Sequence, residues 1–295
     1  MKTYYKNQKS CPLASSPKHA ARLLQGSNVT ASIGFSDKYK TTSTQIEEKH
    51  NTTLAAWWTS TDSAKKDFIS PGQTTYVVGE ESADALRALG QQPSVLDINS
   101  VRTELEQAHL HLPPKSLQDF HEKMLHVIED FSDIFNKYTA IAKDKFVMRI
   151  WQIYAPKGAL GRTPYLHTDH SILTGMWYPY ANRAPAEFYA GDVPEHVWAA
   201  LQPERKGKKR GKLSKKDHQN SLVLQDFTNQ ASPKDLVTLP SGALIVAKNL
   251  KDRADPTGFK DLSKQKARES IFLHKSGDVK STGQVGLIMI PQILR

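Results

Sequence analysis

The sequence predicts an α+β fold in which a helical first half packs on an antiparallel β-sandwich or barrel formed by the second half. Two observations carry this prediction. A long amphipathic helix is indicated over residues 116–138. From residue 146 onward, short strand-like runs are separated by Gly, Pro and Asn turns, without a predicted helix between them. With 38% hydrophobic residues among 295, the chain can build a sizeable core.

The first part of the chain gives weaker signals. Residues 1–50 are rich in Ser, Thr, Lys and Asn, so we expect them to be loosely ordered apart from a short helix over 18–24. A single domain then spans 51–295, with helical support in 51–145 and the β-core in 146–295. The support is expected to contain an apolar run at 54–58, a strand at 74–78 and a short helix at 82–89.

The helix predicted over 116–138 has one apolar face. Leu117, Phe120, Met124 and Phe131 recur at spacings of three, four and seven, as one face of a helix requires. Ser116, three residues before Asp119, resembles a capping box after the Pro113–Pro114 stop.

The clearest strand covers 146–154, where the letters FVMRIWQIY place side chains alternately on two faces. Further strands are expected at 172–178, 187–189, 221–224, 243–248, 270–274 and 284–290. Two polar stretches, 193–216 and 251–268, interrupt this series and are expected to be loops or short helices on the surface.

The net charge of +10 is concentrated in one run. Residues 205–216 (RKGKKRGKLSKK) hold eight Lys or Arg, and the remaining 32 basic residues face 30 acidic ones. A solvated loop is the favoured interpretation, and contact with a nucleic acid or another polyanion is the alternative. The run has no interleaved aromatic residues, so it does not indicate base stacking.

Cellular location is predicted from what the sequence contains. Cys11 is the only cysteine, which excludes an intramolecular disulfide and a cysteine-based metal cluster. No apolar stretch approaches the roughly 20 residues that span a bilayer, and the basic start has no apolar signal region. A cytoplasmic protein without a membrane partner is therefore expected.

The pattern His167-Thr168-Asp169 is the strongest candidate for chemistry. Residues i and i+2 of an extended segment point to the same side, so an imidazole and a carboxylate can reach one ion. His274, at the end of a predicted strand, is the best third ligand. Two His and one carboxylate leave coordination positions open and favour non-haem Fe(II). The alternative is that His167 and Asp169 simply hydrogen-bond to each other at a turn.

The order of these elements resembles the Fe(II)/2-oxoglutarate-dependent dioxygenases. In that superfamily an HxD motif follows an early strand of a double-stranded β-helix, a cupin-like jelly-roll barrel, and a distal His precedes the last strand. The matching segments are YLHTDH (165–170), LPSGALIVAKN (239–249) and IFLHKSGDV (271–279). The chain also resembles an uncharacterised bacterial family of unknown function, through LAAWW (54–58), FVMRIWQIY (146–154), LHTDHSILTGMWY (166–178), PAEFYAG (185–191) and LHKSG (273–277).

The resemblance implies an oxygenase that holds Fe(II) through His167, Asp169 and His274 and uses 2-oxoglutarate as co-substrate. Many members carry an Arg about ten residues beyond the distal His, whereas 282–286 here read TGQVG. In the family this Arg binds a carboxylate of 2-oxoglutarate, so here another basic residue would have to do so. The candidates are Lys275, Lys280, Arg149 and Lys248.

Trp177 and neighbouring aromatic residues are expected to shape the pocket. The spacing of 105 residues between Asp169 and His274 is long for the superfamily, and the two polar interruptions account for the surplus.

The favoured function is hydroxylation or a related oxidation of a small molecule. Two alternatives stay open: a cupin-like metalloenzyme that does not use 2-oxoglutarate, and a non-catalytic β-barrel module whose basic run binds a polyanion.

Overall fold

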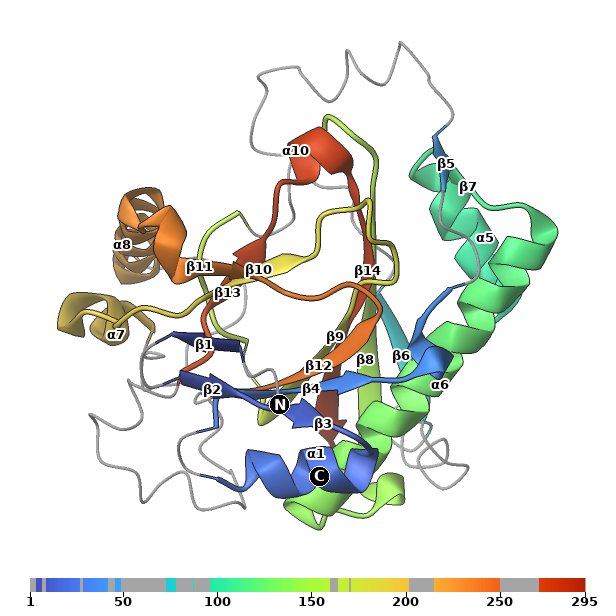
Figure 1. The fold of residues 1–295 in the computed structure, drawn as a ribbon, viewed down its shortest axis with the longest axis horizontal. Coiled ribbons are helices and arrows are strands. Elements are labelled where there is room, and N and C mark those ends of the chain that lie inside the picture. The colour runs from blue at the N-terminus through green and yellow to red at the C-terminus, as the bar shows by residue number, and fades with distance from the viewer. Residues whose placement is uncertain are drawn as a thin grey trace.

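In a computed structural model of the chain, the two larger of the four described β-sheets face each other, with helices on the outer side of each (Figure 1). In Figure 1 the layers run from α7 (Glu195–Leu201) and α8 (Lys215–Gln230) on the left, through the sheets, to α5 (Ile98–Gln107) and α6 (Pro114–Thr139) on the right. The structure describes residues 4–6, 9–26, 29–41, 46–48, 73–77, 87, 96–159, 164–169, 171–201, 215–249 and 271–294.

The larger sheet has seven strands in the order β3-β4-β12-β9-β14-β8-β6. Neighbouring strands are antiparallel except for the parallel pair β3 and β4. The strands are β3 (Leu13–Ala14), β4 (Ala31–Phe35), β6 (Gln73–Val77), β8 (Phe146–Ala155), β9 (Leu173–Trp177), β12 (Ala243–Lys248) and β14 (Gln284–Ile293). The predicted strands at 74–78, 146–154, 172–178, 243–248 and 284–290 are thus confirmed, with small differences at their ends.

The smaller sheet has three strands in the order β11-β10-β13. They are β10 (Ala186–Tyr189), β11 (Leu236–Thr238) and β13 (His274–Ser276), so the strand predicted at 187–189 is confirmed. The prediction that His274 ends a strand is wrong, because His274 begins β13. An isolated antiparallel bridge between His167 and His274 adds one more extended segment beside β13.

The two sheets share an apolar interior. Met176, Ile245 and Ile288 from the larger sheet and Phe188 from the smaller belong to one buried cluster that also includes Phe272. The rings of Phe188 and Phe272 stack with centroids 5.6 Å apart. The chain alternates between the two sheets. β10 and β11 of the smaller sheet come between β9 and β12 of the larger, and β13 comes between β12 and β14. Among the described residues the sheets form a two-layered sandwich, and the expected closure into a barrel is not found.

Helices cover the other face of the larger sheet. α6 lies along it together with α1 (Pro17–Leu24), and α5 packs against α6. Phe120, on α6, stacks on Trp177 of β9 with ring centroids 5.5 Å apart. The helices predicted at 18–24 and 116–138 are confirmed, but the capping box is wrong. Pro113 is the N-cap of α6 and makes no side-chain hydrogen bond, so Ser116 lies inside the first turn.

Gly175 of β9 lies close to α6. A Cβ atom at this position would lie 2.8 Å from the Phe131 ring and 2.8 Å from Met289 Cε. We expect Gly175→Ala to lower the free energy of unfolding by about 1–3 kcal/mol, because a packed core cannot absorb an added methyl without strain. Chemical denaturation measures this.

Gly34, on β4, is the matched control for Gly175. Its added Cβ would meet only ordinary contacts at 3.7 and 3.8 Å. Gly34→Ala is therefore expected to be neutral or to stabilise the fold by up to about 1 kcal/mol. If both variants lose the same free energy of unfolding, the close contact with α6 is not what excludes a side chain at position 175.

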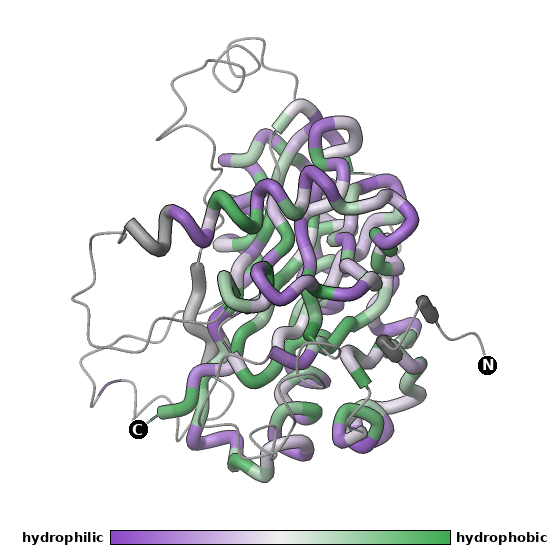
Figure 2. Tube along the Cα trace, turned by 90° about the vertical axis from the view of Figure 1, so that its left-hand side faces the viewer, coloured by the Kyte–Doolittle hydropathy of each residue, from purple (hydrophilic) through white to green (hydrophobic). Residues whose placement is uncertain are grey.

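Two further predictions are corrected by the structure. Residues 1–50 were expected to be loosely ordered, but β4 pairs along its length with β12 and buries Ala31 and Ile33. The run 221–224 was expected to be a strand but lies in α8, whose Val223 and Leu224 pack with α7 residues beside the smaller sheet. Short apolar runs do not distinguish strand from helix by periodicity alone. Figure 2 views this side, where helical segments alternate between hydrophilic and hydrophobic residues.

The remaining elements are short. They are β1 (Tyr4–Lys6), β2 (Lys9–Cys11), β5 (Glu47–Glu48), β7 (Leu110–His111), α10 (Val279–Thr282) and the 3₁₀ turns Asp37–Tyr39, Lys143–Lys145 and Pro233–Asp235. The predictions for 54–58, 251–268, nearly all of 82–89 and the basic run up to residue 214 lie outside the described residues. None of the helices that are described is both long and apolar enough to cross a membrane.

Candidate metal centre

The structure brings His167, Asp169 and His274 together at one end of the sandwich. The two His backbones are joined directly, since His167 N donates to His274 O at 3.0 Å and His274 N donates to His167 O at 2.9 Å. Asp169 follows two residues later, in the segment that leads to β9. One possible ligand atom from each side chain lies within 4.8 Å of the other two. The HxD spacing and the distant His therefore converge as the sequence predicts.

The carboxylate of Asp169 faces both imidazoles. Its Oδ1 lies 3.9 Å from His167 Nε2, and its Oδ2 lies 3.6 Å from His274 Nε2. Both separations exceed hydrogen-bond length, which argues against a simple hydrogen-bonded turn. A metal ion bonds to each ligand atom at about 2.0–2.2 Å. Both separations are shorter than two such bonds end to end, so one ion can bond to both atoms of each pair. The side chain of His167 is 25% exposed and that of His274 is 3% exposed, so the cluster opens toward His167.

The protonation states suit metal binding. His167 Nδ1 donates a hydrogen bond to Tyr165 O at 3.0 Å, and this orients the ring so that Nε2 faces Asp169. Burial, reinforced by the nearby His167 and opposed by Asp169, lowers the pKa of His274 to about 3. His274 is therefore neutral at physiological pH, and among the described residues neither of its ring nitrogens has a hydrogen-bond partner. Two imidazoles and a carboxylate are side-chain groups that bind a metal cation.

Helix α8 supports the segment before the cluster. Thr228, on α8, accepts a hydrogen bond from Leu166 N at 2.8 Å. Leu166 also belongs to the buried cluster that α7 and α8 form with the smaller sheet. Sequence reasoning missed this contact because residues near 221–224 were assigned to a strand.

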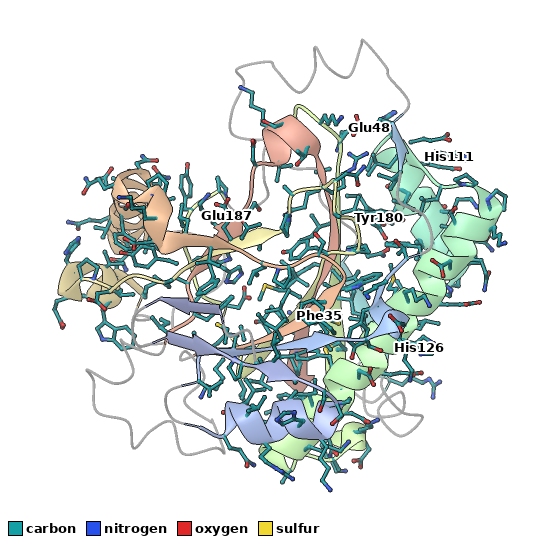
Figure 3. All side chains as sticks on the ribbon, viewed as in Figure 1. Phe35, Glu48, His111, His126, Tyr180 and Glu187 are labelled. Atoms are coloured by element: carbon teal, nitrogen blue, oxygen red, sulfur yellow. The ribbon has the colours of Figure 1, made fainter. Side chains whose placement is uncertain are left out.

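Of the proposed co-substrate residues, the lysines lie away from the cluster. Lys275 is paired with Glu187 at 2.6 Å. Because His274 and its partner Phe188 face the interior, Lys275 and Glu187 point to the opposite face; Figure 3 labels Glu187 on the smaller sheet. Lys280 is exposed on α10. These placements do not favour the predicted roles of Lys275 and Lys280.

Lys248 is engaged on the opposite side of the larger sheet. Its buried Nζ donates to Leu24 O at 3.0 Å and to Gly26 O at 2.9 Å. The lysine therefore caps the C-terminal end of α1 and is turned away from the cluster.

Arg149 points into the sandwich. Its neighbours Met148 and Ile150 belong to the core under the helices, whereas Trp151 packs in the interior between the sheets. Because side chains alternate between the two faces of a strand, Arg149 points to the same interior face as Trp151. Its Nε is buried, and no hydrogen bond to it is found among the described residues. Arg149 lies on β8 and pairs with Ile290 of β14, the strand that separates β8 from β9 in the larger sheet.

Gln284 occupies the position ten residues beyond His274. It is 1% exposed. Gln284 lies four residues before Ile288 on β14, so both side chains face the interior between the sheets. Neither atom of its amide has a hydrogen-bond partner in the described part of the chain. An amide is uncharged, so Gln284 does not supply the positive charge that the sequence lacks here.

Trp177 does not line the candidate site. It is fully buried under α6, and its Nε1 donates to Tyr39 O at 2.9 Å. The next residue, Tyr178, faces the interior, where burial and the charge of Asp169 raise its pKa. This placement does not favour the predicted role of Trp177. An aromatic ring beside the cluster is that of Phe272, whose centroid lies 5.4 Å from that of the His274 ring. His170, also adjacent in sequence, lies outside the described residues.

Comparison with known protein families and with curated proteins finds no match, so the predicted resemblance to an uncharacterised bacterial family has no support. Solved structures give weak similarities. A prolyl-4-hydroxylase from Pseudomonas putida is 11% identical with a TM-score of 0.27, over 84% of this chain and 98% of that one.

The epimerase SnoN is similar at the same level. Its complex with Fe³⁺, alpha ketoglutarate and nogalamycin RO is 13% identical with a TM-score of 0.29, over 82% of this chain and 83% of that one. A second structure, of the non-heme alpha ketoglutarate dependent epimerase SnoN from nogalamycin biosynthesis, is 12% identical with a TM-score of 0.28, over 82% and 80%. At these scores the similarities carry no argument about this chain.

Proposed function

We propose that this protein is a non-haem Fe(II)-dependent oxygenase that uses 2-oxoglutarate to hydroxylate or otherwise oxidise a small molecule. The observation that carries the proposal is the cluster of His167, Asp169 and His274, in which two imidazoles and one carboxylate offer ligand atoms within 4.8 Å of one another. Two His and one carboxylate bind Fe(II) on one side and leave positions for other ligands. The iron, when bound, supplies the redox chemistry by which O₂ oxidises an organic molecule.

The path of the chain supports this proposal. From β8 onward it passes to the His167 segment of the smaller sheet, to β9 of the larger, to β10 and β11, to β12, to β13 and finally to β14. Repeated crossing between two facing sheets is typical of a double-sheet jelly roll. We propose that the sandwich is the expected double-stranded β-helix, with the metal ligands on its smaller sheet.

Each ligand has a defined part in the proposed site. His274 offers a buried lone pair that stays unprotonated near neutral pH. Asp169 supplies one negative charge toward a divalent cation. His167, the most exposed of the three, is held through Nδ1 by Tyr165 O, which fixes the orientation of its ring.

Arg149 is the best candidate to hold a carboxylate of 2-oxoglutarate. Lys275 is paired with Glu187, Lys280 is exposed, and Lys248 caps α1. Arg149 alone among these four points into the sandwich. A guanidinium can bind a carboxylate through two parallel hydrogen bonds.

Anaerobic titration with Fe(II) and 2-oxoglutarate tests the proposed function. We expect one Fe(II) per chain and, on addition of 2-oxoglutarate, a weak visible charge-transfer band of a chelated 2-oxo acid. A control with succinate should give no band, because it lacks the 2-oxo group. Iron binding without a band at millimolar 2-oxoglutarate would favour the cupin-like metalloenzyme. Absence of iron binding would leave the non-catalytic module.

A further inference from the structure

We infer that Asn249 is a positioning residue that holds the segment His167–Asp169 in the geometry needed to bind a metal ion. This inference rests on the proposed function, since it concerns the same site. Asn249 directly follows β12 and is separated from Asp169 by 80 residues in sequence. It is 2% exposed and does not belong to the metal-ligating cluster.

Both polar atoms of the Asn249 side chain are hydrogen-bonded. Its Oδ1 accepts from Thr168 Oγ1 at 3.2 Å, and its Nδ2 donates to Ser171 Oγ at 2.9 Å and to Thr174 Oγ1 at 2.7 Å. Its backbone N also donates to Ile172 O at 3.0 Å. One residue therefore contacts the chain before, within and after the turn that joins the HxD segment to β9.

Thr168 is the contact that matters for the metal ligands. It lies between His167 and Asp169, and in an extended segment its side chain points away from both. A bond from Thr168 to Asn249 fixes the rotation of this short segment about its own axis. That rotation decides whether His167 and Asp169 face His274.

The anchor itself is rigid. β12 lies in the middle of the larger sheet and pairs with β4 on one side and β9 on the other. Lys248, the preceding residue, is tied on the opposite face to the carbonyl groups at the end of α1. Asn249 therefore transmits the position of a fixed strand to a segment for which the described residues give a single β-bridge.

Co(II) binding to the full chain tests this role, because Co(II) reports affinity and ligand geometry without turnover. We expect Asn249→Ala to weaken Co(II) binding about 10–100-fold, the loss typical when a group that orients a metal ligand is removed. The visible d–d absorption of bound Co(II) should also change in shape. Lys248→Met, which removes a buried anchor one residue away, should destabilise the apo protein while leaving Co(II) affinity within about threefold.

Position 168 provides a conservative pair. Thr168→Ser keeps the hydroxyl and should bind Co(II) as the parent does, whereas Thr168→Val should reproduce the loss seen in Asn249→Ala. The double variant Thr168→Val/Asn249→Ala should bind no more weakly than Asn249→Ala alone, since both changes break the same contact.

The outcomes separate this inference from the proposed function. If the parent does not bind Co(II), the proposed metal site fails, and the role of Asn249 fails with it. If the parent binds while Asn249→Ala binds equally well with the same spectrum, only the inference about Asn249 is overturned. Equal losses of affinity in Asn249→Ala and Lys248→Met would also overturn it, because they would indicate general loosening of β12.

Discussion

Replacing Asp169 with alanine is expected to weaken Fe(II) binding by more than about 100-fold, beyond the usual effect of losing a supporting group. Asp169 is the only carboxylate of the described three-residue cluster and faces both imidazoles, at 3.6 and 3.9 Å. Without it, only the two imidazoles of the cluster remain, and the cluster loses its carboxylate. Anaerobic equilibrium dialysis with iron analysis measures the loss.

Thermal unfolding distinguishes loss of the site from loss of the fold. Fe(II) at 100 times its dissociation constant should stabilise the parent by about 2.7 kcal/mol, because it binds only the folded state. It should not stabilise Asp169→Ala. The apo forms should unfold at similar temperatures, since Asp169 belongs to none of the described hydrophobic clusters.

Glu187→Gln is the matched control for Asp169→Ala. It removes one carboxylate charge from the outer face of the smaller sheet, where Glu187 pairs with Lys275. This control should bind Fe(II) as the parent does. Stoichiometric iron in Asp169→Ala, at parental affinity, would contradict the proposed ligand set.

The convergence of His167, Asp169 and His274 was predictable from sequence because most of it depends on local spacing. His167 and Asp169 are two residues apart, and the period of an extended chain alone places them on one side. His274 required only the order of strands. The long helix and most strands were predictable for the same reason, since their periodicity depends on which face is buried.

Choosing between the faces of a fully buried strand was not predictable. Trp177 and Tyr178 are both buried, because β9 lies between the helices and the smaller sheet. Alternation shows that they point in opposite directions but not which one faces the interior between the two sheets. The same ambiguity at β13 made Lys275 a candidate, although it points outward with Glu187.

Contacts between distant segments left no sequence signal. Asn249 meets Thr168 across 81 positions, and Thr228 meets Leu166 across 62. An Asn after a strand most often indicates a turn. Only the pairing of β12 with β9 brings this amide to the HxD segment.

Replacing Arg149 with methionine is expected to raise the dissociation constant of 2-oxoglutarate at least about 30-fold and leave Fe(II) affinity unchanged. Removing one partner of a buried, hydrogen-bonded charge pair costs about 2–5 kcal/mol, and 1.4 kcal/mol is a factor of ten. Methionine keeps much of the length and apolar volume of the arginine stem, so packing against Trp151 and Ile290 should persist. The charge-transfer band gives the dissociation constant directly.

Two variants sharpen this test of Arg149. Arg149→Lys keeps the charge but not the planar fork, so it should recover only part of the affinity. Lys275→Met removes an equal charge on the outer face of the smaller sheet and should not change 2-oxoglutarate binding. If Arg149→Met forms the band at parental concentrations of 2-oxoglutarate, the carboxylate is held elsewhere. The unpartnered amide of Gln284 is then the next position to replace, since it also faces the interior.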